Sequence, residues 1–299
     1  MVEFIDRHKG EHGIEQICTQ LQFAPSTYYA AKSRPLSERA IRDTVLKVVI
    51  VTLFEANYEV YGSRKIWKAA RRAGYDIGRD QVARLMRELG IEGVRRGGHK
   101  VRTTRPDDRA PRSPDLVDRK FTANAPNELW VTDLTYVPTW SGVAFVSFIT
   151  DVYSRMIVGW RVASHMRTDM VLDSLEMARW TRGGGRLEGL ICHSDAGRQY
   201  TSVRYTERID EIGARPSIGT VADSYDNALA ETINGLYKTE LIHRQRPWRT
   251  IDDVELATLG WVHWFNTERL HSALGDMPPV EFEEAHYAQL ATSELVETQ

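Results

Sequence analysis

Three acidic residues far apart in the sequence are the strongest candidates for chemistry in this chain of 299 residues. Asp133 lies in a strand-like run, Asp195 directly follows His193 and Ser194, and Glu231 lies in a helix-like run. Carboxylates brought together from separate elements supply the hard oxygen ligands that Mg²⁺ prefers. Two such ions about 3.5 to 4 Å apart stabilise both the attacking and the leaving oxygen at phosphorus. The three acids therefore predict an enzyme that cuts and joins DNA.

Asp133 occupies a segment with the two-residue period of a β-strand. It shares one strand face with Leu129, Val131, Thr135 and Val137. An unpaired charge in apolar surroundings costs several kcal/mol, so Asp133 is expected to have a metal or a cationic partner. This expectation favours a functional role over a purely structural one.

The segments after Asp133 predict a sheet covered by helices. Strands are expected at 143–149, 156–162 and 190–193, and helices at 169–180 and 203–212. Asp151 to Arg155 is expected to form a tight connection. The complete order, β-β-β-α-β-α-β-α, is typical of an α/β ribonuclease-H-like fold with a mixed five-stranded sheet.

Asp195 is expected at the carboxyl end of the fourth of these strands, where open α/β sheets bind ligands. Gly197 would let the chain bend away behind it. An Asp that only caps a turn in Ser-Asp-Ala-Gly is the alternative. His193 is expected to position the site and not to act as a base, because a metal-activated water needs little further help.

Glu231 has a helical context. A helix over residues 226–241 places Asn227, Glu231, Asn234 and Lys238 on one outward stripe. The opposite stripe is apolar and consists of Leu229, Ile233 and Leu236. Lys238 could contact a DNA backbone as a compact point charge. Since an exposed Glu on a helix is ordinarily only solvated, the assignment of Glu231 depends on the other two acids.

The composition indicates a globular chain, with 42% hydrophobic and 27% charged residues. At roughly 100 to 200 residues per domain, about two domains are expected. No apolar run of about 18 residues exists, so a membrane span is not expected. The first ten residues lack the apolar stretch of a secretory signal. Cys18 and Cys192 have no CxxC partner, which argues against disulfides and zinc and favours a reducing cytoplasm.

Charge is distributed unevenly along the chain. Residues 1–120 contain 24 Lys and Arg against 16 Asp and Glu, a net charge of +8, whereas residues 121–299 contain 15 against 25, a net charge of −10. A basic region attracts phosphates through counterion release, and an acidic region that handles DNA needs metal ions to offset its charge. A solvated basic face is the alternative for the first part.

Residues 1–94 predict a helical DNA-binding region with two helix-turn-helix patterns. The first has a helix from Ile14 to Leu21 and a second helix that begins at Pro25. The second pattern has one helix around Ile66 and another from Val82 to Leu89. Gly90 is a plausible C-cap residue.

Arg79, Arg84 and Arg87 point away from the apolar stripe of the second pattern. A recognition helix needs such an apolar back for packing and Arg side chains for phosphates or guanine edges. These three residues are the candidate DNA contacts of the region. Two packed helices without any DNA contact are the alternative.

Residues 95–124 predict a basic, Pro-rich linker. Helical periodicity is lost from Arg95 to Lys120, and Pro106, Pro111 and Pro114 exclude a helix interior. The linker could follow a DNA backbone, or it could be a spacer without DNA contact. A catalytic core is expected at 125–285 and a C-terminal tail at 286–299.

Several motifs in order carry a resemblance to a known family. In the second half they are Trp130-Val131-Thr132-Asp133, His193-Ser194-Asp195 with Gly197, Gln199-Tyr200-Thr201, Ser224-Tyr225-Asp226-Asn227-Ala228 with Glu231, Lys238, Phe265-Asn266 and Arg269-Leu270-His271. In the first half they are Tyr61-Gly62 with Arg64, and Arg84-Leu85-Met86-Arg87-Glu88. The chain resembles the transposases of the insertion-sequence-three family, relatives of retroviral integrases.

The resemblance implies an integrase-type catalytic core in which Asp133, Asp195 and Glu231 bind two Mg²⁺ ions, with Mn²⁺ able to substitute. It also implies that Asn227 and Lys238 contact DNA. Ala196 and Arg198 depart from the commonest family pattern. The expected partners are element-end and target DNA, further copies of the chain, and an upstream-frame product or a frameshift fusion with it. The expected location is the bacterial cytoplasm, on the nucleoid when bound to DNA.

The expected reaction has two chemically similar steps. Water attacks a phosphodiester at the element end and frees a 3′-hydroxyl, which then attacks a phosphodiester of the target. Neither step needs a covalent protein intermediate, which agrees with the lack of a Ser/His/Asp or reactive Cys arrangement. Two alternatives remain: a hydrolytic nuclease on the same fold, and a DNA-binding regulator with a vestigial carboxylate site.

Overall fold

The computed structural model describes residues 1–95, 113–117, 121–219 and 228–297. The chain forms two compact units, Met1–Thr52 and Leu53–Gln299. Asn227 and most of the basic linker lie outside the described residues. No helix in the described ranges is long and apolar enough to cross a bilayer.

The first unit is helical. It contains α1 (Val2–His12), α2 (Ile14–Gln20), α3 (Pro25–Ser33) and most of α4 (Glu38–Ala56), which continues into the second unit. Ile5, Ile17, Cys18 and Tyr28 form its buried cluster. The predicted pair of helices after Ile14 is confirmed as α2 and α3. The sequence pattern did not predict α1, whose one buried residue is Ile5.

The second helix-turn-helix pattern is confirmed within the second unit. Its helices are α5 (Ser63–Arg72) and α6 (Arg79–Leu89). The two helices pack through buried apolar side chains: Ile66, Ala70, Val82, Leu85 and Met86. Gly90 ends α6 in the left-handed conformation, with φ 69°, which a residue without a Cβ adopts at no steric cost.

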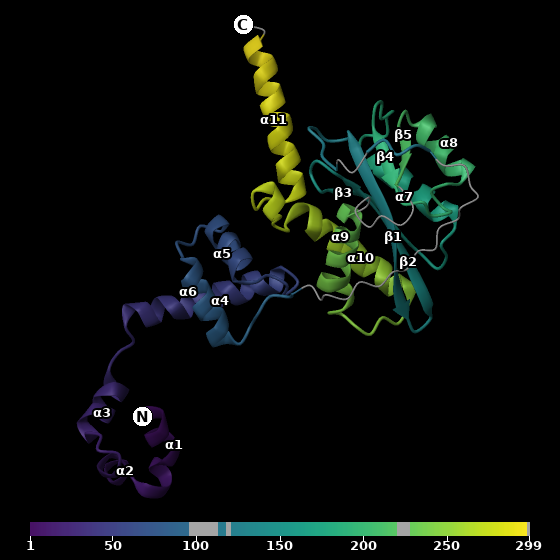
Figure 1. The fold of residues 1–299 in the computed structure, drawn as a ribbon. Coiled ribbons are helices and arrows are strands. Elements are labelled where there is room, and N and C mark those ends of the chain that lie inside the picture. Colours follow the sequence, from purple (N-terminus) through teal and green to yellow (C-terminus); the bar gives the residue numbers. More distant parts are fainter. Residues whose placement is uncertain (96–112, 118–120, 220–227, 298–299) are drawn as a thin grey trace. The chain divides into compact units, whose positions relative to one another are not determined.

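The five-stranded sheet has the element order expected from the sequence (Figure 1). The elements are β1 (Leu129–Thr139), β2 (Gly142–Asp151), β3 (Ile157–Ala163), α7 (Thr168–Thr181), β4 (Ile191–Ser194), α8 (Val203–Glu211), β5 (Arg215–Ile218) and α9 (Ala228–Tyr237). The strands lie in the order β3-β2-β1-β4-β5. β1, β2 and β3 are antiparallel, whereas β4 is parallel to β1 and β5 is parallel to β4.

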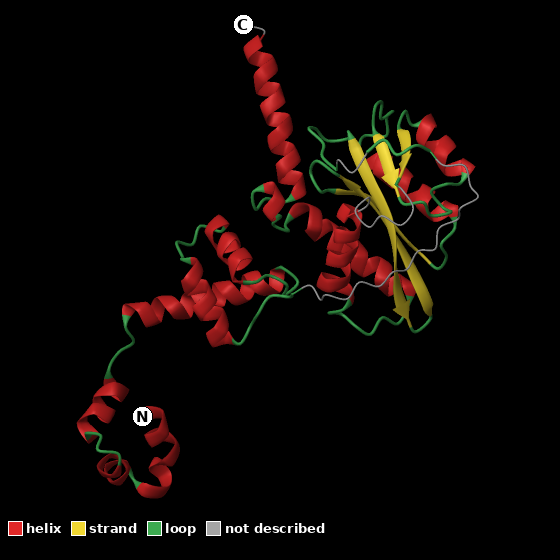
Figure 2. Ribbon diagram, in the orientation of Figure 1, coloured by secondary structure: helices red, strands yellow, loops and turns green. Residues whose placement is uncertain are grey.

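Helices cover both faces of this sheet (Figure 2). On one face Trp130 packs with residues of α7 and α8, such as Leu175 and Ile209. On the other face Val131 packs with Ala230 of α9. Because the first part of β1 is covered on both sides, Leu129 to Thr132 are all buried, whereas buried and exposed residues alternate from Thr135 to Pro138.

The close packing of α7 on β3 requires Gly159. A Cβ at this position would lie 2.2 Å from the Ser174 carbonyl oxygen and 2.8 Å from the Ala178 Cβ. Real Cβ atoms do not approach backbone oxygens so closely, so any larger residue would push the helix off the sheet.

Further helices follow α9. Lys238–Ile242 forms a π-helical turn, and α10 (Ile251–Thr267) begins with a capping box made by Thr250 and Asp253. A short 3₁₀ turn (Ser272–Leu274) precedes α11 (Pro279–Glu297). The core was expected to end at position 285 and to be followed by a tail from position 286. In the structure α11 runs across this boundary, so both sides of it belong to one helix.

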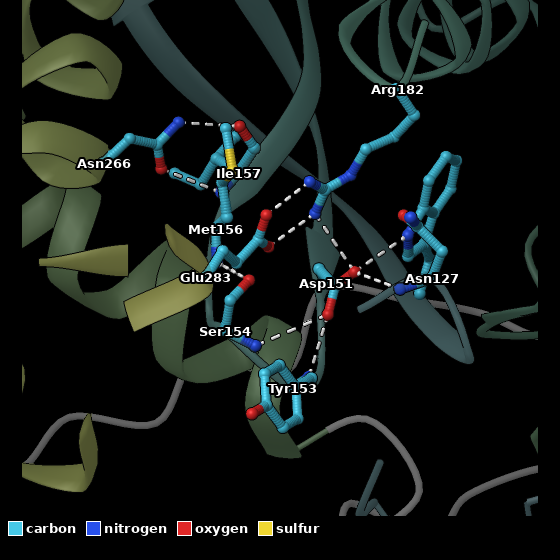
Figure 3. A network of polar contacts seen from close by, with 10 residues as sticks. Asn127, Asp151, Tyr153, Ser154, Met156, Ile157, Arg182, Asn266 and Glu283 are labelled. Carbon is cyan, nitrogen blue, oxygen red and sulfur yellow. Dashed lines mark hydrogen bonds and ion pairs between the residues drawn. The ribbon is translucent and has the colours of Figure 1, made fainter. Parts of the chain in front are cut away.

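Asp151 does more than form a turn, because it is the centre of a buried polar network (Figure 3). Its carboxylate accepts hydrogen bonds from the backbone N–H groups of Asn127 and Tyr153, at 2.8 and 2.9 Å, and lies 3.2 Å from an Arg182 nitrogen. Arg182, which follows α7, also binds both carboxylate oxygens of Glu283 at 2.5 and 2.6 Å. The network joins the start of β1, the end of β2, α7 and α11.

Candidate active site

Asp133 and Asp195 lie at the same point of the sheet. β1 and β4 are parallel neighbours whose paired residues run from Leu129 with Ile191 to Thr132 with Ser194. Asp133 and Asp195 are the next residue on each chain. Neighbouring strands are about 4.8 Å apart, so the two carboxylates emerge side by side where β4 ends. The prediction that Asp195 directly follows a strand is confirmed.

The electrostatics of Asp133 reflect this crowding of negative charge. Its side chain is half-buried, and the pKa of its carboxyl is raised to about 7 by burial and by the nearby Asp195, with a smaller contribution from Glu231. Hydrogen bonds from the Leu134 backbone N–H and the Asn234 amide oppose this shift of the pKa. Burial also raises the pKa of Asp195. A cation at this point would therefore be strongly stabilised.

Gly197 is needed because a side chain at this position would collide with its neighbours, and not because the backbone needs a conformation that favours glycine. The chain bends away after Asp195 as expected, but the φ of Gly197 lies outside the left-handed region, so the backbone conformation does not require glycine here. A Cβ at this position would lie 2.9 Å from Asp195 Oδ1 and 3.3 Å from Gln199 Oε1. The Gly197 N–H donates to the same Asp195 oxygen at 3.1 Å, and this bond orients the carboxylate.

Asn234 is a site residue that the sequence did not identify. It was expected on the outward stripe of its helix, but its side chain is only 9% exposed. Its Nδ2 donates to Asp133 Oδ2 at 2.9 Å, and its Oδ1 is buried with no hydrogen-bond partner among the described residues. The expectation was wrong because α9 packs on β1, which turns part of the polar stripe inward. The spacing of three residues from Glu231 was the available signal.

Glu231 lies in the first turn of α9 and is exposed. Asn234, one turn further along, bonds Asp133, so Glu231 lies on the helix side that faces the two aspartates. Its contribution to the raised pKa of Asp133 agrees with this position. In the described part of the chain, however, no three His, Cys, Asp or Glu side chains are grouped closely enough to hold a metal ion as they stand.

Lys238 lies near the acids, at the start of the π-helical turn. Its ammonium group lies 4.8 Å from the centre of the Tyr136 ring, three residues along β1 from Asp133. Burial lowers the pKa of Lys238, and the charge of Asp133 opposes that shift. Lys238 is therefore close enough to Asp133 to interact with its charge.

His193 has a structural environment. It is buried, and its Nδ1 lies 2.9 Å from the Ser217 hydroxyl of β5, which also accepts a hydrogen bond from the Leu116 N–H. The Phe121 ring packs edge-on against the imidazole. These contacts fix the end of β4 and agree with a positioning role. Arg198 lies in the exposed loop after β4.

The three candidate arginines of the helix-turn-helix region lie on α6. Arg79 pairs with Asp80 at 3.2 Å and Arg84 with Glu88 at 2.6 Å, whereas Arg87 is exposed in the last turn.

Family comparisons match the helix-turn-helix region and the region of the five-stranded sheet separately. The family of integrase core domains matches residues 123–224, and a second family with the same description matches residues 212–279. The family of HTH-like domains matches residues 40–99. Among solved structures, the simian T-cell lymphotropic virus intasome has a chain that aligns with a TM-score of 0.45 and 14% identity, covering 78% of this chain and 74% of that one.

Two curated relatives match over nearly their whole length. The putative transposase for insertion sequence element IS986/IS6110 of Mycobacterium tuberculosis (strain ATCC 25177 / H37Ra) is 55% identical over 272 residues, 90% of this chain and 98% of that protein. The transposase for insertion sequence element IS629 of Shigella sonnei is 46% identical over 300 residues, 99% of each chain. With an HTH-like region, an integrase core and relatives of this identity, the chain belongs to the insertion-sequence-three family of transposases.

Proposed function

We propose that this transposase cleaves the ends of its insertion sequence and joins them to target DNA, with Asp133, Asp195 and Glu231 as the catalytic acids and ligands of two Mg²⁺ ions. The observation that carries the proposal is the register of β1 and β4, which sets Asp133 and Asp195 side by side at the end of β4. Glu231 lies on the side of α9 that faces these aspartates, since Asn234, one turn further along, bonds Asp133, and this position supports its role as the third acid.

The residues present fit a hard divalent cation. The donor set consists of carboxylate oxygens and the unpartnered Asn234 Oδ1, which are the ligand types that Mg²⁺ and Mn²⁺ take. When bound, the ions would offset the charge of the acids and polarise the reacting phosphodiester. The side chains of the three acids would draw together on binding, since mutual repulsion opposes this approach when no cation is present.

The other residues of the site orient its parts. The Gly197 N–H holds one oxygen of Asp195, and the Asn234 amide holds one oxygen of Asp133. Lys238 places a positive charge near Asp133, and this charge would attract a DNA phosphate to the site.

A cleavage and joining assay tests the proposal. Purified protein, alone or fused to the upstream-frame product, is incubated with Mg²⁺ and labelled duplexes that carry the element ends. Cleaved ends together with strand-transfer products are expected. Cleavage without joined products would favour a hydrolytic nuclease, and band shifts without cleavage would favour a DNA-binding regulator.

Binding of Mg²⁺ is expected to stabilise the protein through Asp133. A ligand that binds only the folded state raises its free energy of unfolding, so millimolar Mg²⁺ should raise the unfolding temperature of the wild-type protein. Asp133→Asn should abolish this rise. In chelator the variant should be at least as stable as the wild type, because it removes a half-buried carboxylate whose charge is disfavoured. Differential scanning fluorimetry measures both effects, and an equal rise in the two proteins would contradict the assignment.

Arg84 and Arg87 of α6 are proposed DNA contacts, together with Arg79 and Asn227. Replacing Arg84 and Arg87 by Ala should weaken DNA binding and reduce the slope of log Kd against log salt by about two, because about one counterion is released per phosphate contact. Fluorescence anisotropy at several salt concentrations measures the slope. Arg71→Ala on α5, where Arg71 pairs with Asp76, is the control. An unchanged slope would make α6 a structural helix only.

The proposal extends to domains and partners. The helix-turn-helix region (1–94) and the linker (95–124) would bind DNA, and the core (125–285) would perform the chemistry, followed by residues 286–299. Joining two element ends requires more than one active chain, so a homo-oligomer with element-end and target DNA is proposed, acting with the upstream-frame product or fused to it. The proposed location is the bacterial cytoplasm, at the nucleoid.

A further inference from the structure

The pair of strands β1 and β2 continues beyond the catalytic aspartate as an arm. β4 pairs with β1 only as far as Thr132, and from Asp133 to Thr139 β1 pairs, among the described strands, only with β2 (Figure 1). The arm ends in a turn that carries Trp140, whose side chain is 71% exposed. An indole that is mostly exposed gains little from burial, so its contribution to folding is small.

The tip of the arm is fixed to the loop that precedes α10. The Trp140 N–H donates to the Trp248 carbonyl at 3.0 Å, and the Ser141 N–H donates to the Arg249 carbonyl at 3.1 Å. Trp248 is buried, and its indole N–H donates to the Ile242 carbonyl at 3.1 Å, which holds the loop against the π-helical turn. Trp140 and Arg249 therefore stand in a defined arrangement.

Aromatic and basic side chains are paired along this arm. Near the acids, Lys238 lies over the Tyr136 ring, and at the tip the Arg249 guanidinium lies 5.9 Å from the centre of the Trp140 ring. Arg246, which contacts His243, and Arg249 are exposed, and neither is paired with a carboxylate of the described residues. A surface that binds nucleic acid combines exposed aromatic rings with cations that are free to pair with phosphates, and this arm has both.

We propose that Trp140, Arg249 and Arg246 form a second DNA-contact site of the catalytic core. This site binds duplex DNA some nucleotides away from the phosphodiester that reacts at the acids. Trp140 lies seven positions after Asp133, which is about 23 Å of strand. A DNA strand advances about 3.4 Å per nucleotide, so the tip meets DNA about seven nucleotides from the phosphodiester at Asp133. Arg249 and Arg246 contact phosphates, and Trp140 contacts the sugar and base. This distance along the DNA rests on the proposed function of the acids.

The DNA at the tip has two sources, the element end and the target, and crosslinking distinguishes them. Trp140 is replaced by the photoreactive residue p-benzoylphenylalanine in the full chain, with Asp133→Asn present to prevent cleavage. Each sample contains one labelled duplex, with either the element's terminal sequence or an unrelated sequence. The matched control places the same photoreactive residue at Trp180 of α7, which is also 71% exposed.

Crosslinks are expected from position 140 and not from position 180. On the duplex that occupies the arm they should lie about seven nucleotides from the phosphodiester that reacts in the wild-type protein. Crosslinks from both positions alike, or from neither, would overturn the inference. The readout needs no catalysis, so the two proposals can fail separately. Cleavage by the wild-type chain without crosslinks from position 140 of the photoreactive variant refutes only the arm. Crosslinks from position 140 together with a wild-type chain that never cleaves refute only the proposed reaction.

Affinity provides a second measurement. Trp140→Ala is expected to raise Kd for the occupied duplex about tenfold, as is typical when a nucleic-acid-binding aromatic is truncated. Trp140→Phe should retain most of the affinity, since the ring face remains. Arg249→Gln should reduce the salt slope by about one. The control Trp180→Ala is expected to leave the affinity and the salt slope unchanged. The same result for Trp140→Ala and Arg249→Gln would contradict a DNA contact at the tip.

Discussion

Replacing Glu231 by Gln is expected to abolish cleavage and strand transfer while DNA binding stays nearly unchanged. The amide keeps the shape of the side chain but removes the charge that would hold a divalent cation between α9 and the end of β4. Loss of transition-state charge stabilisation by metal costs several kcal/mol, which corresponds to a rate lower by about 10³-fold or more. Removing a negative charge beside a phosphate does not weaken binding, so Kd should not rise.

The control for this substitution is Glu207→Gln. Glu207 is likewise an exposed glutamate on a helix of the core, but it lies on α8 and not on α9, the helix that bonds Asp133. Rates of cleavage and joining on labelled element ends, measured beside Kd by anisotropy, separate chemistry from binding. Activity of Glu231→Gln within about tenfold of the wild type, or loss of binding together with activity, would refute the assignment of Glu231.

Replacing Arg182 by Met is expected to destabilise the second unit by about 3 to 5 kcal/mol, because it leaves two buried carboxylates without their cation. The side chains of Arg182, Asp151 and Glu283 are 9%, 0% and 8% exposed. Met fills much of the volume of Arg, so the loss reports on charge more than on a cavity. Urea unfolding followed by circular dichroism measures the change in free energy of unfolding.

The effect of Arg182→Met should depend on pH in a defined direction. Burial already raises the pKa of Asp151, and Arg182 counteracts that rise. Without the arginine the pKa of Asp151 in the folded protein rises further, so the folded state binds a proton more readily than the unfolded state does. Its stability then increases as pH falls. The difference from the wild type should therefore be largest at neutral pH and smaller at about pH 5.

The matched control is Arg179→Met, three residues earlier on α7. Arg179 is more exposed and lies 3.6 Å from Glu176, in an ion pair of the kind that contributes at most about 1 kcal/mol. An equal, small loss of stability in both variants, without dependence on pH, would mean that the buried network of Asp151 contributes no more than a surface pair.

The sequence predicted the sheet well because its pattern is local. Alternation in β1, short apolar runs for the following strands and the helical period of α7 and α8 each depend on residues a few positions apart. The same holds for α5 and α6 and for Gly90, whose left-handed conformation follows from the lack of a Cβ. The residue pattern of each of these elements is therefore visible in its own short stretch of sequence.

The sequence could not predict contacts between elements. Asn234 was assigned to an outward stripe, because helical spacing fixes which residues share a face but not which part of that face meets a strand. Asp151 was interpreted as part of a tight connection, because its partners Arg182 and Glu283 lie 31 and 132 positions away in the sequence. Trp140 and Arg249 had no assigned role, because only the loop before α10 brings them together.

The sequence by itself determined which residues carry charge, which runs form strands and helices, and the family to which the chain belongs, since these follow from residue type and order. The tertiary structure alone decided that β4 lies parallel to β1 in a register that sets Asp195 beside Asp133. It also decided that α9 covers β1, so that an amide of that helix reaches Asp133. The physical reason is that packing between distant elements minimises the free energy of the whole chain, and no local pattern encodes which partners meet.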